Sequence, residues 1–181
     1  MKKILMMLFL VNLVGCQSIS IGKLDTSKLI EVEMKDLSDE QKKGIPLTYE
    51  AQSLGEGLEA LPFKITLPEK LPFDAMPFQP PVIDDMKHDG KYLMVHFRAF
   101  PKNKENLIFM VQVDYPVTNS NVPNAEEIIL DKNVTGYYAG NALGFQLENV
   151  FYNIVYVNKN ISIEQHKKEM IEVANQMIEQ N

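Results

Sequence analysis

Cysteine is almost absent from this sequence of 181 residues: Cys16 is the only one, and tryptophan is missing altogether. A lone thiol excludes a disulfide within the chain. Arginine is equally scarce, since Arg98 is the only one among 18 basic residues. The 24 acidic residues leave a net charge of −6, which argues against nucleic acid and other polyanions as partners.

Sequence signatures of catalysis and of metal binding are also lacking. His88, His96 and His166 lie far apart, and none has metal-ligand spacing with another ligand. Asp84-Asp85 with Asp89 resembles a calcium loop only in part, because the glycine and the terminal glutamate of that motif are misplaced. No G-x-S-x-G, H-E-x-x-H or phosphate-binding loop occurs. We therefore predict a protein without enzymatic activity, metal or other cofactor.

Long hydrophobic runs are confined to the N-terminus, where Ile4 to Val11 are all apolar and follow Lys2 and Lys3. A basic start, a short apolar stretch and small residues before a cleavage site are typical of a secretory signal. The run is too short for a helix that crosses a hydrocarbon layer about 30 Å thick. Residues 1–15 are therefore predicted to be a signal peptide.

This segment ends in Leu13-Val14-Gly15-Cys16, which resembles the bacterial lipobox. In proteins with that motif, the cysteine receives a diacylglyceryl group and the chain is cut just before it. The resemblance implies lipidation at Cys16 and attachment to membrane lipid on the extracytoplasmic side, and it accounts for the single thiol. A plain secretory signal with a chance cysteine is the alternative. Loss of Lys2 and Lys3 with the signal changes the net charge from −6 to −8.

Residues 16–60 are interpreted as the acylated cysteine followed by an acidic linker or arm, because their apolar residues are scattered among charges. Residues 30–35 alternate with the period of a strand, and Ser38 and Gln41 have capping-box spacing before Gly44. These short patterns either dock on the main domain or belong to a solvated tether, and we favour the tether. A flexible coil of the 44 residues from 17 to 60 would span roughly 35–40 Å.

A proline-rich segment begins at Leu61, and residues 61–81 hold six of the ten prolines. Proline fixes one backbone angle and withholds a donor, so this segment should be extended. One interpretation is a polyproline ligand for a partner, because Pro77 and Pro80 have P-x-x-P spacing. The interpretation that we prefer is a rigid segment that lays three phenylalanines over a sheet: Phe63, Phe73 and Phe78.

The clearest structural pair is Lys91 to Ala99 with Leu107 to Tyr115, joined by the polar loop 100–106. Both segments alternate apolar and polar residues, which is the period of a half-buried strand. As a hairpin they would present one wholly apolar face and one mixed face. The expected pairs are Phe97 with Phe109, Val95 with Val111 and Leu93 with Val113.

Further strands are predicted at 126–130, 137–138, 143–147 and 151–157, the last two pairing in one of two registers. Ser162 should begin a helix to about Glu179, with Gln165 in the capping-box position. One apolar stripe of this helix should cover the apolar face of the sheet. Its members are Ile163, Met170, Ile171, Ala174, Met177 and Ile178.

These elements predict a single α+β domain over residues 61–181. An antiparallel β-sheet of about five or six strands would pack against one C-terminal helix. Because the apolar periodicity begins at Leu61, a chain from Ala60 to Asn181 is predicted to fold alone.

The mixed face of the central hairpin is the one group of side chains that suggests binding. It combines aromatic, thioether, imidazole, guanidinium, amide and carboxylate groups. The alternative is an ordinary solvent-facing side of an antiparallel sheet. The candidate residues are Tyr92, Met94, His96, Arg98, Met110, Gln112 and Asp114.

Four features together resemble a group of uncharacterised extracytoplasmic domains of unknown function, which follow lipobox or membrane anchors in Gram-positive envelope proteins. They are the proline-rich residues 67–73, a glycine-punctuated strand over 136–144, an aromatic hairpin over 145–156, and a final helix with Ile171, Ala174 and Ile178. Phe145 stands where that group would be expected to have tryptophan. The resemblance implies a cell-membrane location in a Gram-positive bacterium, no activity, and no functional residues.

Two functions remain as hypotheses. The first is a membrane-anchored envelope lipoprotein whose domain is a non-catalytic module that binds an envelope protein or a wall component. The second is a carrier or sensor that holds an apolar ligand between sheet and helix. A pocket of several hundred Å³ between helix and sheet would favour the carrier, and a close-packed core with an exposed aromatic patch would favour the binding module.

Overall fold

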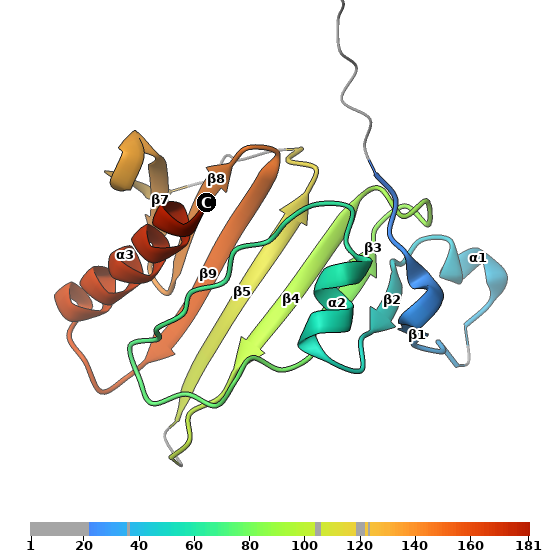
Figure 1. Ribbon diagram of the computed structural model, residues 1–181, viewed down its shortest axis with the longest axis horizontal. Helices are drawn as coiled ribbons and strands as arrows, with labels where there is room; N and C mark the ends of the chain where they lie inside the picture. The colour runs from blue at the N-terminus through green and yellow to red at the C-terminus, as the bar shows by residue number, and fades with distance from the viewer. Residues whose placement is uncertain (1–21, 36, 104–105, 119–121, 123) are drawn as a thin grey trace, which may run out of the picture.

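The computed structural model describes residues 22–35, 37–103, 106–118, 122 and 124–181. The predicted signal peptide and Cys16 lie outside these residues. Within them the chain forms one antiparallel sheet of nine strands, with helices on one side (Figure 1). The α+β class with a C-terminal helix is thus confirmed, whereas the expected five or six strands were too few.

The strands follow the order β1-β2-β3-β4-β5-β9-β8-β7-β6 across the sheet. Their bounds are β1 (Ile30–Glu31), β2 (Leu47–Glu50), β3 (Val82–Asp85), β4 (Leu93–Ala99), β5 (Leu107–Tyr115), β6 (Glu126–Ile129), β7 (Thr135–Ala139), β8 (Ala142–Leu147) and β9 (Val150–Asn158). The α-helices are α1 (Asp39–Lys42), α2 (Leu54–Ala60) and α3 (Ile163–Gln180), and two 3-10 turns are η1 (Thr26–Lys28) and η2 (Asp131–Asn133).

The central hairpin of β4 and β5 has the predicted faces but a different register. All odd-numbered residues of β4 are buried, as expected from the alternation. Phe97 pairs with Val111 rather than with Phe109, which lies opposite Ala99. A shift by two residues keeps every side chain on its own face, so the apolar pattern determined the faces without determining the partners.

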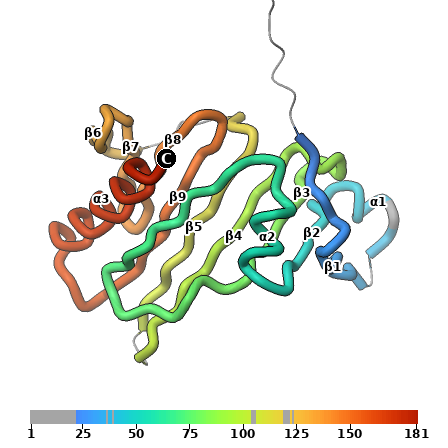
Figure 2. The backbone as a smooth tube through the Cα atoms, in the orientation of Figure 1, coloured from blue at the N-terminus to red at the C-terminus, as the bar shows by residue number. Residues whose placement is uncertain are grey.

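The proline-rich residues 61–81, here called the strap, cross the sheet as an extended segment (Figures 1 and 2). Their aromatic rings pack on the sheet as predicted. Phe63 stacks on Tyr115 with ring centroids 4.1 Å apart, and Phe73 and Phe78 both lie about 6 Å from Phe109. The strap therefore closes part of the core that α3 does not reach. Pro77 and Pro80 are exposed, and their use as a polyproline ligand stays a prediction.

Helix α3 covers the sheet beside the strap and contacts β8 and β9. Ser162 caps it, because its side chain accepts a hydrogen bond from the backbone N–H of Gln165. The inner face includes Met170 and Met177, as expected. Ile163 was wrongly assigned to that face, since 76% of it is exposed at the first turn, whereas His166 was missed.

Residues 22–60 belong to the same folded unit, which differs from the expected boundary at residue 61. Strand β2 pairs with β3 along four residues, and β1 pairs with β2. Leu24 and Tyr49 are part of the core. These elements are two to seven residues long, too short for their periodicity to stand out, and tertiary contacts with β3 and the strap place them.

Candidate interaction face

The side of the sheet opposite α3 and the strap is called here the open face. In Figure 1, α2, α3 and the strap all lie on the near side of the sheet, and α1 lies to the right of β2, at the end of the sheet that β1 closes. The register brings six of the seven candidate residues to the open face, and Tyr92, which precedes β4, lines a hollow together with Met94 and Asp114. Met94 lies beside Asp114, His96 beside Gln112 and Arg98 beside Met110. Six of the seven are half-buried, and Arg98 is exposed.

Four apolar side chains form a group on the open face, near the β4–β5 loop. Ile108 pairs with Val157 and Met110 pairs with Val155 across β5 and β9. Ile108 is 60% exposed, and the other three are half-buried. These four residues are called the apolar patch. The alternation of apolar and polar residues identified Met110 from the sequence. Its neighbours on β9 follow from the register between β5 and β9, which the sequence left open.

Polar side chains occupy the middle of the open face and bond to one another. The Thr48 hydroxyl donates to Asp84 Oδ1 at 2.6 Å, and Asp84 Oδ2 lies 3.3 Å from His96 Nε2. Gln112 Nε2 donates to Asp114 Oδ1 at 3.2 Å. Burial raises the pKa of the Asp114 carboxyl, while the hydrogen bond from Gln112 and the nearby His96 lower it in part. The face therefore holds a carboxylate whose charged form is disfavoured by the fold.

A hollow of about 270 Å³ lies at the other end of the open face, beside the β3–β4 loop. Tyr92, Met94, Asp114 and Phe151 contribute to its lining. The ammonium of Lys87 sits 3.3 Å above the centre of the Tyr92 ring. The volume of the hollow lies just below the range of about 300–1,000 Å³ that is typical of small-molecule sites.

The remaining histidines take part in structure away from the open face. His166 is buried, with Nε2 2.7 Å from the Tyr156 carbonyl and Nδ1 3.2 Å from the Tyr138 hydroxyl. His88 Nε2 lies 2.7 Å from the carbonyl of Ile45. Since a carbonyl can only accept, these two Nε2 atoms carry the protons.

The part of the sequence that suggested a calcium loop forms a tight turn between β3 and β4. The buried Asp85 carboxylate accepts backbone N–H groups from Lys87, Asp89 and Gly90. Its oxygens are therefore engaged by the loop itself. Within the described ranges, no group of three or more His, Cys, Asp or Glu is placed to hold a metal ion.

The interface between α3 and the sheet is filled by side chains. A cavity able to hold a ligand would leave accessible surface on the residues that line it. The residues of α3 and the sheet that meet there are at most 2% exposed: Met170, Val173, Ala174, Met177, Ile178, Leu143, Phe145, Tyr152, Ile154 and Tyr156.

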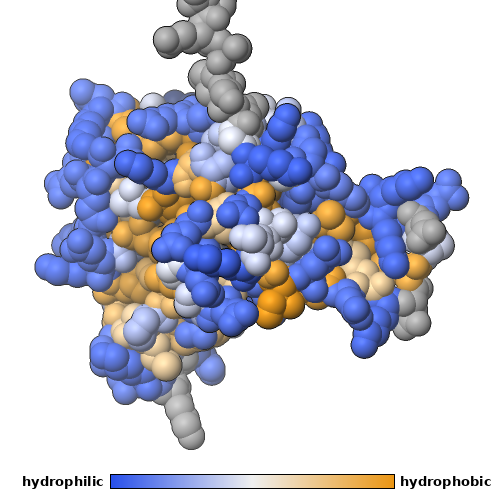
Figure 3. All heavy atoms as spheres, turned by 45° about the vertical axis from the view of Figure 1, so that its right-hand side comes forward, coloured by the Kyte–Doolittle hydropathy of each residue, from blue (hydrophilic) through white to orange (hydrophobic). Residues whose placement is uncertain are grey.

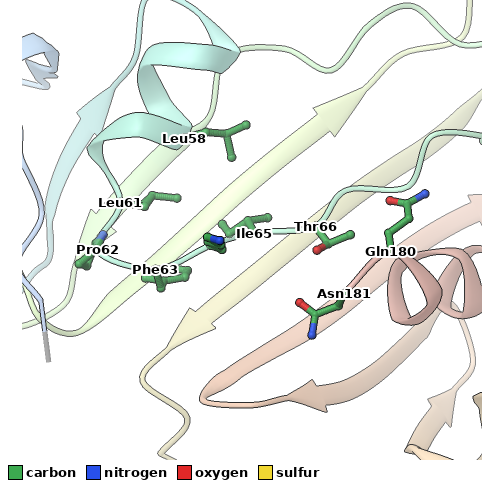
Figure 4. Close-up of a pocket in the computed structure, with 9 residues that line it drawn as sticks. Leu58, Leu61, Pro62, Phe63, Ile65, Thr66, Gln180 and Asn181 are labelled. Carbon is green, nitrogen blue, oxygen red and sulfur yellow. The ribbon is translucent and has the colours of Figure 1, made fainter. Parts of the chain in front are cut away.

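A groove of about 600 Å³ lies outside this interface, between the strap and the end of α3. Figure 4 shows Gln180 and Asn181 across from the strap residues Phe63 to Thr66. In Figure 3, a view that includes the strap side, apolar residues form separate groups among hydrophilic ones. The groove is thus a surface feature of mixed character rather than an enclosed apolar chamber.

A scan against protein-family models found no match, and searches of curated proteins and of solved structures found none either. Among the helices that the structure describes, none is long and apolar enough to cross a membrane.

Proposed function

We propose that this protein is a bacterial envelope lipoprotein, anchored in the cell membrane through acylated Cys16, whose folded domain is a non-catalytic module that binds another envelope protein. Residues 1–15 would be removed as the signal peptide, as the lipobox-like motif suggests. The resemblance to Gram-positive extracytoplasmic domains is part of this proposal.

The observation that carries the binding proposal is the apolar patch on the open face. Removing apolar surface from water contributes roughly 25 cal/mol per Å², and Ile108 has most of its surface still exposed. Met, Arg and aromatic residues are enriched at the centres of protein interfaces. Arg98 and Met110 are paired neighbours at the patch. A protein partner with an apolar centre and an acidic rim fits this arrangement.

The filled interface beneath α3 favours the binding module over the carrier of an apolar ligand. A carrier needs an enclosed space, and the side chains of α3 that face the sheet have almost no accessible surface. The open face is already accessible, so it can engage a partner while the core stays packed.

The test is capture of envelope proteins by cross-linking in cells, with two matched variants of the full chain. Ile108→Lys places a charge in the patch, whereas Ile163→Lys places one at a similarly exposed position on α3. We expect Ile108→Lys and Arg98→Glu to lose a specific cross-linked protein that Ile163→Lys retains. Melting temperatures should stay within a few degrees of the unchanged protein, because these side chains are exposed.

Retention of the same cross-linked proteins by all variants would overturn the assignment of the open face. Recovery of wall polymer instead of a protein would show that the partner is a wall component and would overturn the proposal of a protein partner.

A further inference from the structure

We infer that the end of the sheet formed by the β3–β4 loop (residues 86–92) and Lys23 rests on the anionic headgroups of the membrane that anchors the chain. This inference depends on the proposed anchor at Cys16, and it adds where the bilayer lies relative to the fold.

A short length of chain separates the proposed anchor from the folded domain. Leu24 is only 5% exposed, and its backbone N–H donates to the Gly90 carbonyl at 2.8 Å. Asp25 N–H donates to the Ala60 carbonyl at 2.9 Å. Position 24 is therefore held in the domain, and eight Cα–Cα steps from Cys16 reach at most about 29 Å. This is shorter than the average span expected of a linker that ended at residue 60.

This short connection joins the domain at the end of the sheet that bears the β3–β4 loop. Figure 1 shows the first described residues at the upper end of the sheet, where the β3–β4 loop also lies. The hydrogen bond from Leu24 to Gly90 joins the two directly. The β4–β5 loop lies at the opposite, lower end. The anchor therefore holds the β3–β4 loop near the bilayer and the apolar patch away from it.

The end of the sheet nearest the proposed anchor carries exposed basic side chains. Lys23, Lys87 and Lys91 are exposed there, and Met86 is 45% exposed. Each basic side chain near an anionic leaflet strengthens binding about fivefold, and a covalent anchor adds a high effective concentration.

The carboxylates at this end are held by backbone N–H groups, and among the described residues none of them forms an ion pair with Lys23, Lys87 or Lys91. Asp85 is buried and accepts three backbone N–H groups. Asp25 and Asp89 each accept one backbone N–H within their own turns. Three lysines against these three carboxylates leave this end near neutral in a chain with a net charge of −6, and the lysines are exposed whereas Asp85 is buried, so the lysines are the groups that can reach anionic headgroups.

The single cysteine allows a direct test. The chain from Cys16 to Asn181, which contains every described residue, is coupled through Cys16 to a maleimide lipid in vesicles. One set of vesicles is neutral phosphatidylcholine and the other is rich in phosphatidylglycerol. Acetylation of each lysine by an amine-reactive ester is then followed by mass spectrometry. We expect acetylation of Lys23, Lys87 and Lys91 to be several-fold slower on the anionic vesicles, with Lys102 and Lys168 unchanged.

The matched variants are Lys23→Glu with Lys91→Glu, and Lys168→Glu on α3. The double variant should abolish the slower acetylation of Lys87 on anionic vesicles, whereas Lys168→Glu should leave it intact. Equal rates on both vesicles, or uniform slowing of all lysines, would overturn the inference. Because the coupling supplies the anchor chemically, such a result is independent of lipidation in the cell, whose own failure would appear as absent fatty-acid labelling at Cys16.

Discussion

At the scale of single residues, Phe97 shows how the core depends on the inner face of β4. Its ring has no accessible surface. We expect Phe97→Ala to lower the free energy of unfolding by about 3–5 kcal/mol, because it removes buried apolar contacts and leaves a cavity. Urea denaturation measures the loss. Phe100→Ala, at a half-exposed position three residues later, is the matched control and should cost much less.

Asp114 makes stability depend on pH, because burial raises the pKa of its carboxyl above the ordinary value of 3.8. The folded state then holds the proton more tightly than the unfolded state, so stability falls as pH rises from that ordinary value through the raised pKa. We expect Asp114→Asn to be slightly more stable at neutral pH and to lose this part of the pH dependence.

The measurement for Asp114 is the free energy of unfolding at a series of pH values for both proteins. Gln112→Glu is a useful comparison, since it removes the amide that donates to Asp114 and adds a second carboxylate beside it. If the free energy of unfolding of Asp114→Asn changed with pH in the same way as that of the unchanged protein, the Asp114 carboxyl would have the same pKa in the folded and the unfolded state. A carboxylate kept at a cost to stability is typical of functional surfaces.

At the scale of elements, the described part of residues 22–60 supports the sheet in two ways. Strand β2 supplies backbone partners to β3, and Leu24 and Tyr49 add to the core. Helix α2 precedes the strap and packs against its last residue: Gly57 lies so near Pro81 that a β-carbon would come within 2.2 Å of the proline ring. The close approach explains why a glycine stands inside this short helix.

Truncation tests this contribution. We expect a chain beginning at Ala60 to melt well below a chain beginning at Gln17, or to lose its cooperative transition. The shorter chain lacks β2, so β3 becomes an unpaired edge that favours aggregation. Thermal unfolding followed by circular dichroism compares the two. Identical melting curves would restore residue 61 as the start of an independent domain.

At the scale of the whole molecule, the described chain enters the domain at one end of the sheet, and the apolar patch lies toward the other. Leu24 bonds to Gly90 at the first end, and the patch lies toward the β4–β5 loop, so an anchor at Cys16 would be nearer to the Gly90 end. A partner in the envelope would then reach the patch without competing with the bilayer.

Lipidation at Cys16 is the prediction on which this arrangement depends. We expect Cys16→Ser to abolish incorporation of a labelled fatty acid and to release the protein from the membrane fraction, because no other cysteine can carry the thioether. Ser18→Ala, two residues further along, should retain both properties. Continued labelling of the Cys16→Ser protein would refute the anchor.

The sequence was most informative where a pattern repeats over many residues. Alternation in β4 and β5 identified the buried side of each strand, because successive side chains point to opposite faces. Ser162 and the apolar spacing after it located α3 within a residue at each end. Two-residue spacing leaves the register undetermined, which is why the pairing of Phe97 was predicted two residues away from its actual partner.

Only the tertiary structure decided which surfaces remain free. The even-numbered side of β5 is an open face because α3 and the strap both pack on the other side. No local pattern in β5 determines which side they cover. His166 likewise became a buried group because Tyr138 and Tyr156, distant in sequence, satisfy its ring nitrogens. Local periodicity is set by neighbours along the chain, whereas burial is set by whichever distant segment covers a face, and that is why the sequence determined the faces and the structure determined their exposure.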